Sequence, residues 1–206
     1  GASLISGLKE KNIFGDGRNL DLTLNTSDNK NQYRFGIVEP YIFNKKIDLI
    51  YDLGFQENDY AKSSSYKLET FSSSIGLRYL LTDQINHTIS FEYALKDYTI
   101  TDASTVSSNI NKQAGKNSEI SLNNSLVYND LDSFVRPTEG DFIRYDNVLS
   151  PVTNDDNGYI KNILTHKKYY KLKSNVFSIQ NRIGNIFSLQ NDEIPVSDKF
   201  SLGGRW

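Results

Sequence analysis

Cysteine is absent from this chain of 206 residues, which excludes a disulfide framework and a thiolate metal site. No apolar run reaches the roughly 18 residues that a transmembrane helix needs. Neither sign of charge dominates, and a formal net charge of −2 argues against a nucleic-acid-binding surface. A secretory signal is not visible either, because the chain starts inside a strand-like pattern at Gly1-Ala2-Ser3-Leu4. The chain is therefore interpreted as an internal fragment of a longer protein.

What the chain does contain is alternation of apolar and polar residues in runs typical of β-strands. In residues 85–99, for example, Phe91 and Tyr93 share one face, while Ser90 and Glu92 share the other. The second face is too polar for the core of a small soluble barrel, but it suits the wet lumen of an outer-membrane barrel. The fold class is therefore predicted to be all-β, an antiparallel transmembrane β-barrel whose apolar face meets lipid.

The pattern divides the chain into about ten strands that form one meander. They are predicted at residues 2–12, 18–26, 32–42, 47–57, 68–80, 85–99, 118–130, 141–150, 159–172 and 175–189. Tight turns are expected to alternate strictly with polar loops: the turns near 14–17, 43–46, 82–84 and 173–174, the loops near 27–31, 58–67, 100–117 and 151–158. Interfacial aromatic girdles are expected to include residues near strand ends, namely Tyr41, Phe43, Tyr98 and Tyr128.

Four short motifs stand in a fixed order along these strands. They are Asn12-Ile13-Phe14-Gly15-Asp16-Gly17, Glu39-Pro40-Tyr41-Ile42-Phe43, Arg136-Pro137-Thr138-Glu139-Gly140-Asp141, and the segment from Ile194 to Gly203-Gly204. Together they resemble motifs of the BamA family of outer-membrane assembly factors, in the POTRA-plus-barrel superfamily that is also called the bacterial surface antigen family. In that family these motifs are an aromatic Gly-x-Gly turn, the end of the fourth strand, a periplasmic turn, and the opening of the long sixth extracellular loop.

The resemblance implies a barrel of about sixteen strands preceded by periplasmic POTRA domains. Residues 1–206 would form an open, partial outer-membrane barrel domain, with the POTRA domains and the terminal strands missing. Members of the family fold and insert β-barrel proteins into the bacterial outer membrane by strand pairing at a barrel seam. The chain is thus expected not to be an enzyme and to use no cofactor. Its expected partners are outer-membrane lipids, unfolded β-barrel clients and accessory assembly lipoproteins, with no nucleic acid.

Other functions stay open on the sequence alone. Within the superfamily, the chain could belong to an autotransporter-assembly relative or to a two-partner secretion transporter. A passive, porin-like channel would also have a polar inward face. A soluble β-rich binding protein is the third class.

No group of side chains predicts catalysis or a metal site. His87 is predicted on the outward face and His166 in a lysine-rich strand end, with no carboxylate or cysteine at ligand spacing. The acidic segment 154–158 lacks the distal glutamate of a calcium-binding hand, so it is predicted to be a solvated loop.

The signature turn holds the charges with the most to interpret. Arg136 and Glu139 are predicted to face periplasmic water while Pro137 and Gly140 shape the turn. Contact with a POTRA domain or an accessory lipoprotein is the alternative. In the last motif, the glycine pair at 203–204 is expected to let a long loop fold back into the lumen.

Overall fold

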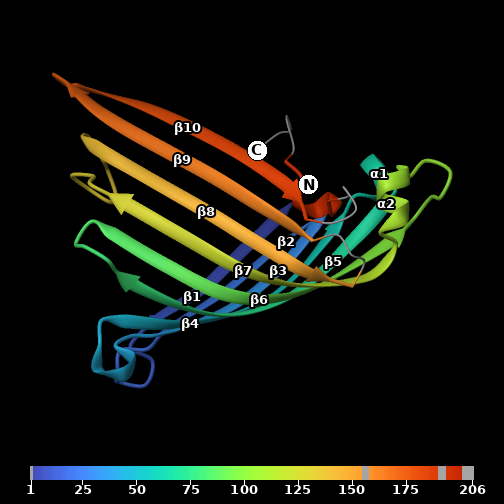
Figure 1. The fold of residues 1–206 in the computed structure, drawn as a ribbon, viewed down its shortest axis with the longest axis horizontal. Helices are drawn as coiled ribbons and strands as arrows, with labels where there is room; N and C mark the ends of the chain where they lie inside the picture. Colours follow the sequence, from blue (N-terminus) through green and yellow to red (C-terminus); the bar gives the residue numbers. More distant parts are fainter. Residues whose placement is uncertain (1, 155–157, 190–193, 201–206) are drawn as a thin grey trace.

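The computed structural model describes residues 2–154, 158–189 and 194–200. Ten antiparallel strands lie in chain order in a single curved sheet (Figure 1). They are β1 (Ser3–Lys11), β2 (Asn19–Ser27), β3 (Lys30–Glu39), β4 (Ile47–Asp59), β5 (Tyr66–Leu80), β6 (Ile85–Ile100), β7 (Gly115–Asn129), β8 (Gly140–Thr153), β9 (Tyr159–Leu172) and β10 (Asn175–Ser188). Within the described residues the sheet is open, since β1 pairs only with β2 and β10 only with β9. The predicted all-β class and the ten-strand meander are confirmed.

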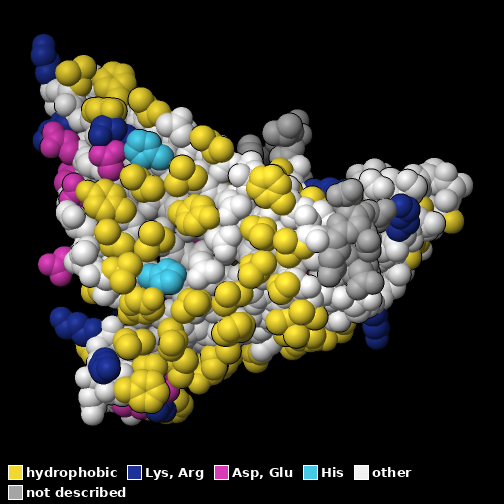
Figure 2. Space-filling view, viewed as in Figure 1, with side chains coloured by type: hydrophobic (Ala, Val, Ile, Leu, Met, Phe, Trp, Pro, Cys, Tyr) yellow, Lys and Arg dark blue, Asp and Glu magenta, His cyan; other side chains and the backbone are white. Residues whose placement is uncertain are grey.

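The two faces of the sheet differ as the alternation predicts. On β6, Phe91 and Tyr93 point outward and are 60% and 43% exposed, whereas Ala94 and Tyr98 point inward and are 4% and 2% exposed. Hydrophobic side chains spread over the outward face of the strands (Figure 2). Tyr98 therefore has the parity of the inward face, and its prediction as an outward girdle residue is wrong.

The two ends of the sheet carry different connections. One end, here called the helix end, carries the short helices α1 (Ala61–Ser64) and α2 (Ser108–Lys112), and the opposite end is called the turn end (Figure 1). The strict alternation of short and long connections is wrong. At the helix end, β2 and β3 stay paired up to Ser27 and Lys30, which leaves a turn of only Asp28 and Asn29. At the turn end, the connection over 12–18 is longer than that.

Several strand boundaries differ from prediction by one to three residues, and two of the differences have local reasons. β3 ends at Glu39 rather than at residue 42, because Pro40 has no N–H to donate and Tyr41 adopts a left-handed φ of 57°. A short 3-10 turn, η1 (Ile42–Asn44), follows. β7 begins at Gly115, three residues earlier than predicted, since α2 shortens the loop before it.

The largest apolar cluster of the described chain lies at the helix end, on the inward face. Tyr66, Leu68 and Tyr98 are buried there under Ile110 of α2, and Val196 packs against them. The rest of the inward face is mostly polar, so this cluster is a cap at one end rather than a central core. None of the helices in the described ranges is long and apolar enough to cross a membrane.

Candidate functional site

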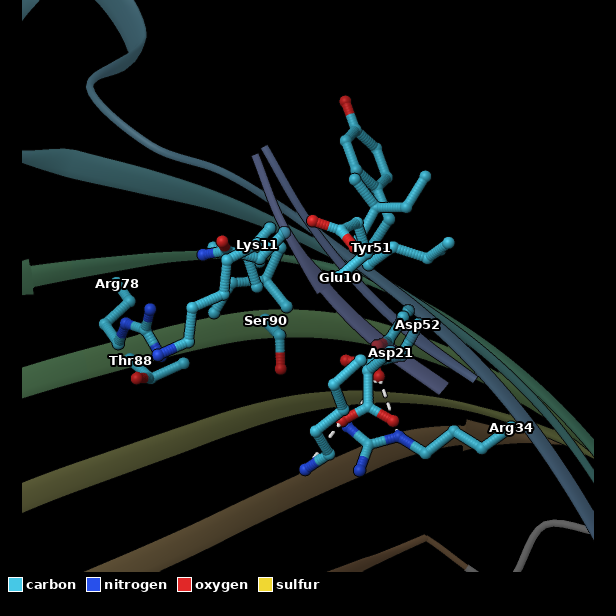
Figure 3. Close-up of a pocket in the computed structure, with 18 of the residues that line it drawn as sticks. Glu10, Lys11, Asp21, Arg34, Tyr51, Asp52, Arg78, Thr88 and Ser90 are labelled. Atoms are coloured by element: carbon cyan, nitrogen blue, oxygen red, sulfur yellow. Dashed lines mark hydrogen bonds and ion pairs between the residues drawn. The ribbon is translucent and has the colours of Figure 1, made fainter. Parts of the chain in front are cut away.

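The inward face of β1–β6 lines a cavity of about 670 Å³. Its polar lining includes Asp21, Arg34, Asp52, Arg78 and Ser90, which the register brings onto one face of the sheet. Arg34, Asp52 and Asp21 gather together in Figure 3, whereas Tyr51 points away from them. The cavity is therefore a wet, charged surface of the kind expected in a barrel lumen.

Charges on this inward face are paired across neighbouring strands. Arg34 donates two hydrogen bonds to Asp52 Oδ1, at 2.9 Å from Nε and 2.6 Å from Nη2. Arg78 binds Asp48 Oδ2 in the same way, at 3.0 and 2.6 Å. Because these pairs are partly exposed, each contributes little to stability, about 0–1 kcal/mol. Each of these two arginines thus has a carboxylate partner on a neighbouring strand.

A second part of the site is a segment that returns to the inward face after β10. The segment comprises residues 194–200 and includes the short helix η2 (Val196–Asp198). Its Asp198 carboxylate lies 2.7 Å from Lys96 Nζ on β6, which also contacts Glu119 Oε2 on β7 at 2.8 Å. The side chains of Lys96, Glu119 and Asp198 are only 10%, 11% and 18% exposed. We call Lys96, Glu119 and Asp198 the buried triad.

Further contacts support the buried triad and hold the same segment. Tyr159 donates its hydroxyl hydrogen to Glu119 Oε1 at 3.2 Å, and Lys161 Nζ donates to the Asp198 carbonyl at 2.7 Å. The Phe200 ring occupies the space beside Gly184, where a Cβ would lie 2.5 Å from Cζ of the ring. The segment is therefore seated in a specific site on β6, β7, β9 and β10.

The connection between β6 and β7 holds the segment from the helix end. The Val196 N–H donates to Gln113 Oε1 at 3.0 Å, and the Val196 side chain joins the apolar cluster with Ile110. Gln113 itself is buried, with 5% exposure. This connection and the returning segment together cover the inward face at the helix end.

The signature turn lies at the turn end, between β7 and β8. Asp132 organises it, because its Oδ1 accepts hydrogen bonds from the N–H groups of Thr138 at 2.8 Å and Glu139 at 3.1 Å. Gly140 has a φ of 108°, and a Cβ there would lie 2.1 Å from the carbonyl oxygen of Asp130. Pro137 and Thr138 are half-buried within the turn. The backbone geometry at Gly140 thus explains why position 140 holds glycine.

Arg136 and Glu139 are exposed, and no hydrogen bond or ion pair of their charged groups is found among the described residues. Replacing both with alanine in the full-length protein is expected to leave client insertion nearly unchanged, since neither charge supports the turn. Reconstituted insertion into lipid vesicles would measure this. A clear loss of insertion with an intact fold would instead assign the two charges to contact with a partner.

The pKa of Asp132 lies at about 2, below the usual 3.8, because its carboxylate accepts hydrogen bonds from the Thr138 hydroxyl and from two backbone N–H groups. A lowered folded pKa means that the carboxylate supports the turn fully above about pH 4 and loses that support as the pH falls towards 2. The amide chemical shifts of Thr138 and Glu139 should therefore titrate with a midpoint near pH 2 and not titrate in Asp132→Asn. A midpoint near pH 4 would contradict this account.

Two other motif turns lie against each other at the turn end. Gly15 and Gly17 adopt positive φ angles of 79° and 88°. The position of a Gly17 Cβ would be 3.3 Å from Cγ of Pro40, and Arg18 Nη2 lies 3.2 Å from Glu39 Oε1. The structure thus brings together two motifs that the sequence places apart. The Tyr41 side chain beside them is 65% exposed.

The remaining candidates are placed as follows. His87 faces outward as predicted, with Nδ1 2.7 Å from the Tyr79 hydroxyl. His166 does have a carboxylate partner, Asp141, at 2.9 Å, which the sequence spacing did not predict. Across the described residues, no group of three or more such side chains could hold a metal ion. The predictions for the acidic loop at 155–157 and for Gly203 and Gly204 lie outside the described residues.

Sequence reasoning missed the buried triad. The alternation in residues 85–99 places Lys96 on the polar face, and Asp198 lies within the last motif, but neither pattern indicates that the two side chains meet. The available signal was weak: a lysine on an inward face, followed one strand later by an inward glutamate.

The sequence model of the Omp85 superfamily domain matches residues 12–205. The chain belongs to the Omp85 superfamily. It is therefore an outer-membrane protein, and the predicted membership of the POTRA-plus-barrel superfamily is confirmed.

A solved structure supports the fold of this Omp85 chain. The chain is similar to the crystal structure of BamA from Haemophilus ducreyi lacking POTRA domains 1-3, with a TM-score of 0.84 and 19% sequence identity. The match covers 98% of this chain and 41% of that one, so the chain spans about two fifths of the BamA chain. No curated protein sequence matches the chain.

Proposed function

We propose that this Omp85 chain is part of an assembly factor that folds β-barrel proteins and inserts them into the bacterial outer membrane. The observation that carries the proposal is the superfamily match over residues 12–205. The remaining barrel strands and POTRA domains would lie in other parts of the protein. Its partners would be lipids, unfolded β-barrel clients and accessory lipoproteins.

The physical basis of this function needs no bond-making chemistry. A strand entering lipid with unpaired N–H and C=O groups costs several kcal/mol for each unsatisfied group. An open strand edge held at the membrane can pair those groups as they enter, which lowers the barrier to insertion. No catalytic group or cofactor is required for this role.

The returning segment supports this proposal over a passive channel. A diffusion channel needs a clear path through its lumen, but here residues 194–200 are seated on the inward face by the buried triad and Phe200. Such a contact restricts the path available to a solute at the helix end.

Reconstitution of the full-length protein tests the proposal. Liposomes with and without it would receive a urea-unfolded barrel client, and the folded client would be measured by its heat-modifiable gel mobility. We expect faster folding with the protein present. Equal folding in both, together with rapid solute flux, would replace the proposal with a channel, and export of a polypeptide without insertion would favour a secretion transporter.

A further inference from the structure

Four asparagines form a row on the outward face, one on each of four neighbouring strands. The register aligns them directly across β7, β8, β9 and β10 as Asn124, Asn147, Asn162 and Asn185. Each amide nitrogen donates to the next amide oxygen, at 3.5 Å from Asn124 to Asn147, 2.8 Å from Asn147 to Asn162 and 2.9 Å from Asn162 to Asn185. We call these residues the asparagine row.

The row lies at the depth of the hydrocarbon. Asn147 is the eighth of the 14 residues of β8 and six residues from Asp141. At about 3.4 Å per residue and a tilt of about 40°, it is roughly 15 Å from Asp141, near the middle of an apolar band about 25 Å tall. The neighbouring outward residue Tyr145 turns its hydroxyl to Asn162 Oδ1 at 2.7 Å. An unpaired amide at this depth would cost several kcal/mol.

The apolar pattern of these strands does not by itself fix their register. A slip of one residue would exchange the two faces, but a slip of two residues keeps every side chain on its face. The connection between β8 and β9 runs over residues 154–158, so it is longer than a two-residue hairpin turn and its length does not fix their register. The pair β7 and β8 contains a register shift between Ile120 and Leu122. An interaction that forms in only one register must therefore select the observed pairing.

We propose that the asparagine row selects the pairing of β8 with its neighbours β7 and β9 inside the membrane, whereas the two-residue turn Lys173-Ser174 fixes the register of β9 with β10. In the observed register each amide meets an amide. A two-residue slip between β8 and β9 would instead place Asn147 opposite Ile160 or Leu164 and leave its amide unpaired in lipid. Apolar residues in the row would be more favourable in contact with lipid. A slipped pairing would then leave no amide unpaired, so nothing at these positions would disfavour it. The inference is independent of the proposed function, since it concerns how this side of the barrel is built.

Cysteine cross-linking in the full-length protein tests the proposal, provided that the full-length protein is free of other cysteines, as residues 1–206 are. Asp146 and Ile163 are cross-strand partners, so Asp146→Cys with Ile163→Cys reports the observed register. Val148→Cys with Ile163→Cys reports the two-residue slip that places Asn147 opposite Leu164, and Arg144→Cys with Ile163→Cys reports the slip that places it opposite Ile160. Each pair would be treated with a short bifunctional thiol reagent, once with the asparagine row intact and once with all four asparagines changed to leucine.

With the row intact, only the pair at 146 and 163 should cross-link. With four leucines, cross-linking at 148 and 163, or at 144 and 163, should rise at least about tenfold, because a slipped pairing would no longer leave an amide unpaired and one hydrogen bond alone contributes about that factor. A neighbouring-row control, Leu164→Val with Ile183→Val, should not slip. Heat-modifiable mobility would verify folding in every variant.

Cross-linking at 146 and 163 alone in the four-leucine variant would overturn the proposal. If that variant fails to fold, Asn162→Leu alone gives the decision. It removes the central amide, so slipped cross-linking must still rise, and an unchanged pattern there is equally decisive against the proposal.

Discussion

Replacing Gly140 with alanine should open the signature turn and lower the free energy of unfolding of the barrel by about 3 kcal/mol or more. A left-handed backbone imposes about 1–3 kcal/mol of strain on a residue with a Cβ, and overpacking adds about 1–3 kcal/mol. Here the new Cβ would lie 2.1 Å from the Asp130 carbonyl oxygen. The paired backbone groups at the neck of the turn, from Asp130 N–H to Asp141 O at 2.9 Å, would have to separate.

Gly15→Ala is the matched control for this effect. Gly15 lies in another connection at the turn end and also has a positive φ, of 79°, but nothing lies within 4 Å of its Cβ position. The free energy of unfolding of Gly15→Ala should therefore fall by only about 1 kcal/mol, the cost of a positive φ for a residue with a Cβ. Urea unfolding of both full-length variants in the same lipid would measure the difference. Equal losses would show that the backbone at Gly140 relaxes around the added methyl group.

Lys96→Met should release the returning segment and destabilise the barrel by about 3–5 kcal/mol, because it leaves two buried carboxylates facing each other without a cation. Lys96 Nζ contacts Glu119 and Asp198 at 2.8 and 2.7 Å. A cysteine placed at Val196 in the otherwise cysteine-free chain would report the release. Its labelling by a membrane-impermeant thiol reagent should become faster in Lys96→Met, alongside a lower melting temperature.

Removing all three charges of the buried triad provides the control. The triple variant Lys96→Met, Glu119→Gln, Asp198→Asn has no buried charge at this site and should recover much of the lost stability. Val196 would then be protected again if packing and the Lys161 hydrogen bond suffice to seat the segment. A triple variant as unstable as Lys96→Met would show that the cation itself organises the site.

The faces of the strands could be predicted because alternation is a local property. Phe91 and Tyr93 face outward as their spacing predicts, and the luminal parity of Glu92 follows from the same count. Tyr98 was assigned from its place near a strand end rather than from its parity, which is why it was misplaced. Counting alternate residues from Glu92 would have placed it inward.

The candidate site could be predicted only where it is formed by consecutive residues. The signature turn is local, so its glycine and proline were identified from sequence. The contact between Lys96 and Asp198 joins residues 102 positions apart, and no local pattern encodes it. The asparagine row depends on register, which a period of two leaves undetermined. Long-range pairing therefore accounts for what sequence reasoning missed.

The buried triad also bears on the order in which the protein can be built. Hairpins between consecutive strands need only short chain closures, whereas the seat of residues 194–200 draws on β6, β7, β9 and β10 at once. Contacts of high sequence separation form late, because their loop entropy must be overcome before they contribute. The segment can dock only after these strands have paired and curved, so its docking marks the completion of this wall of the barrel.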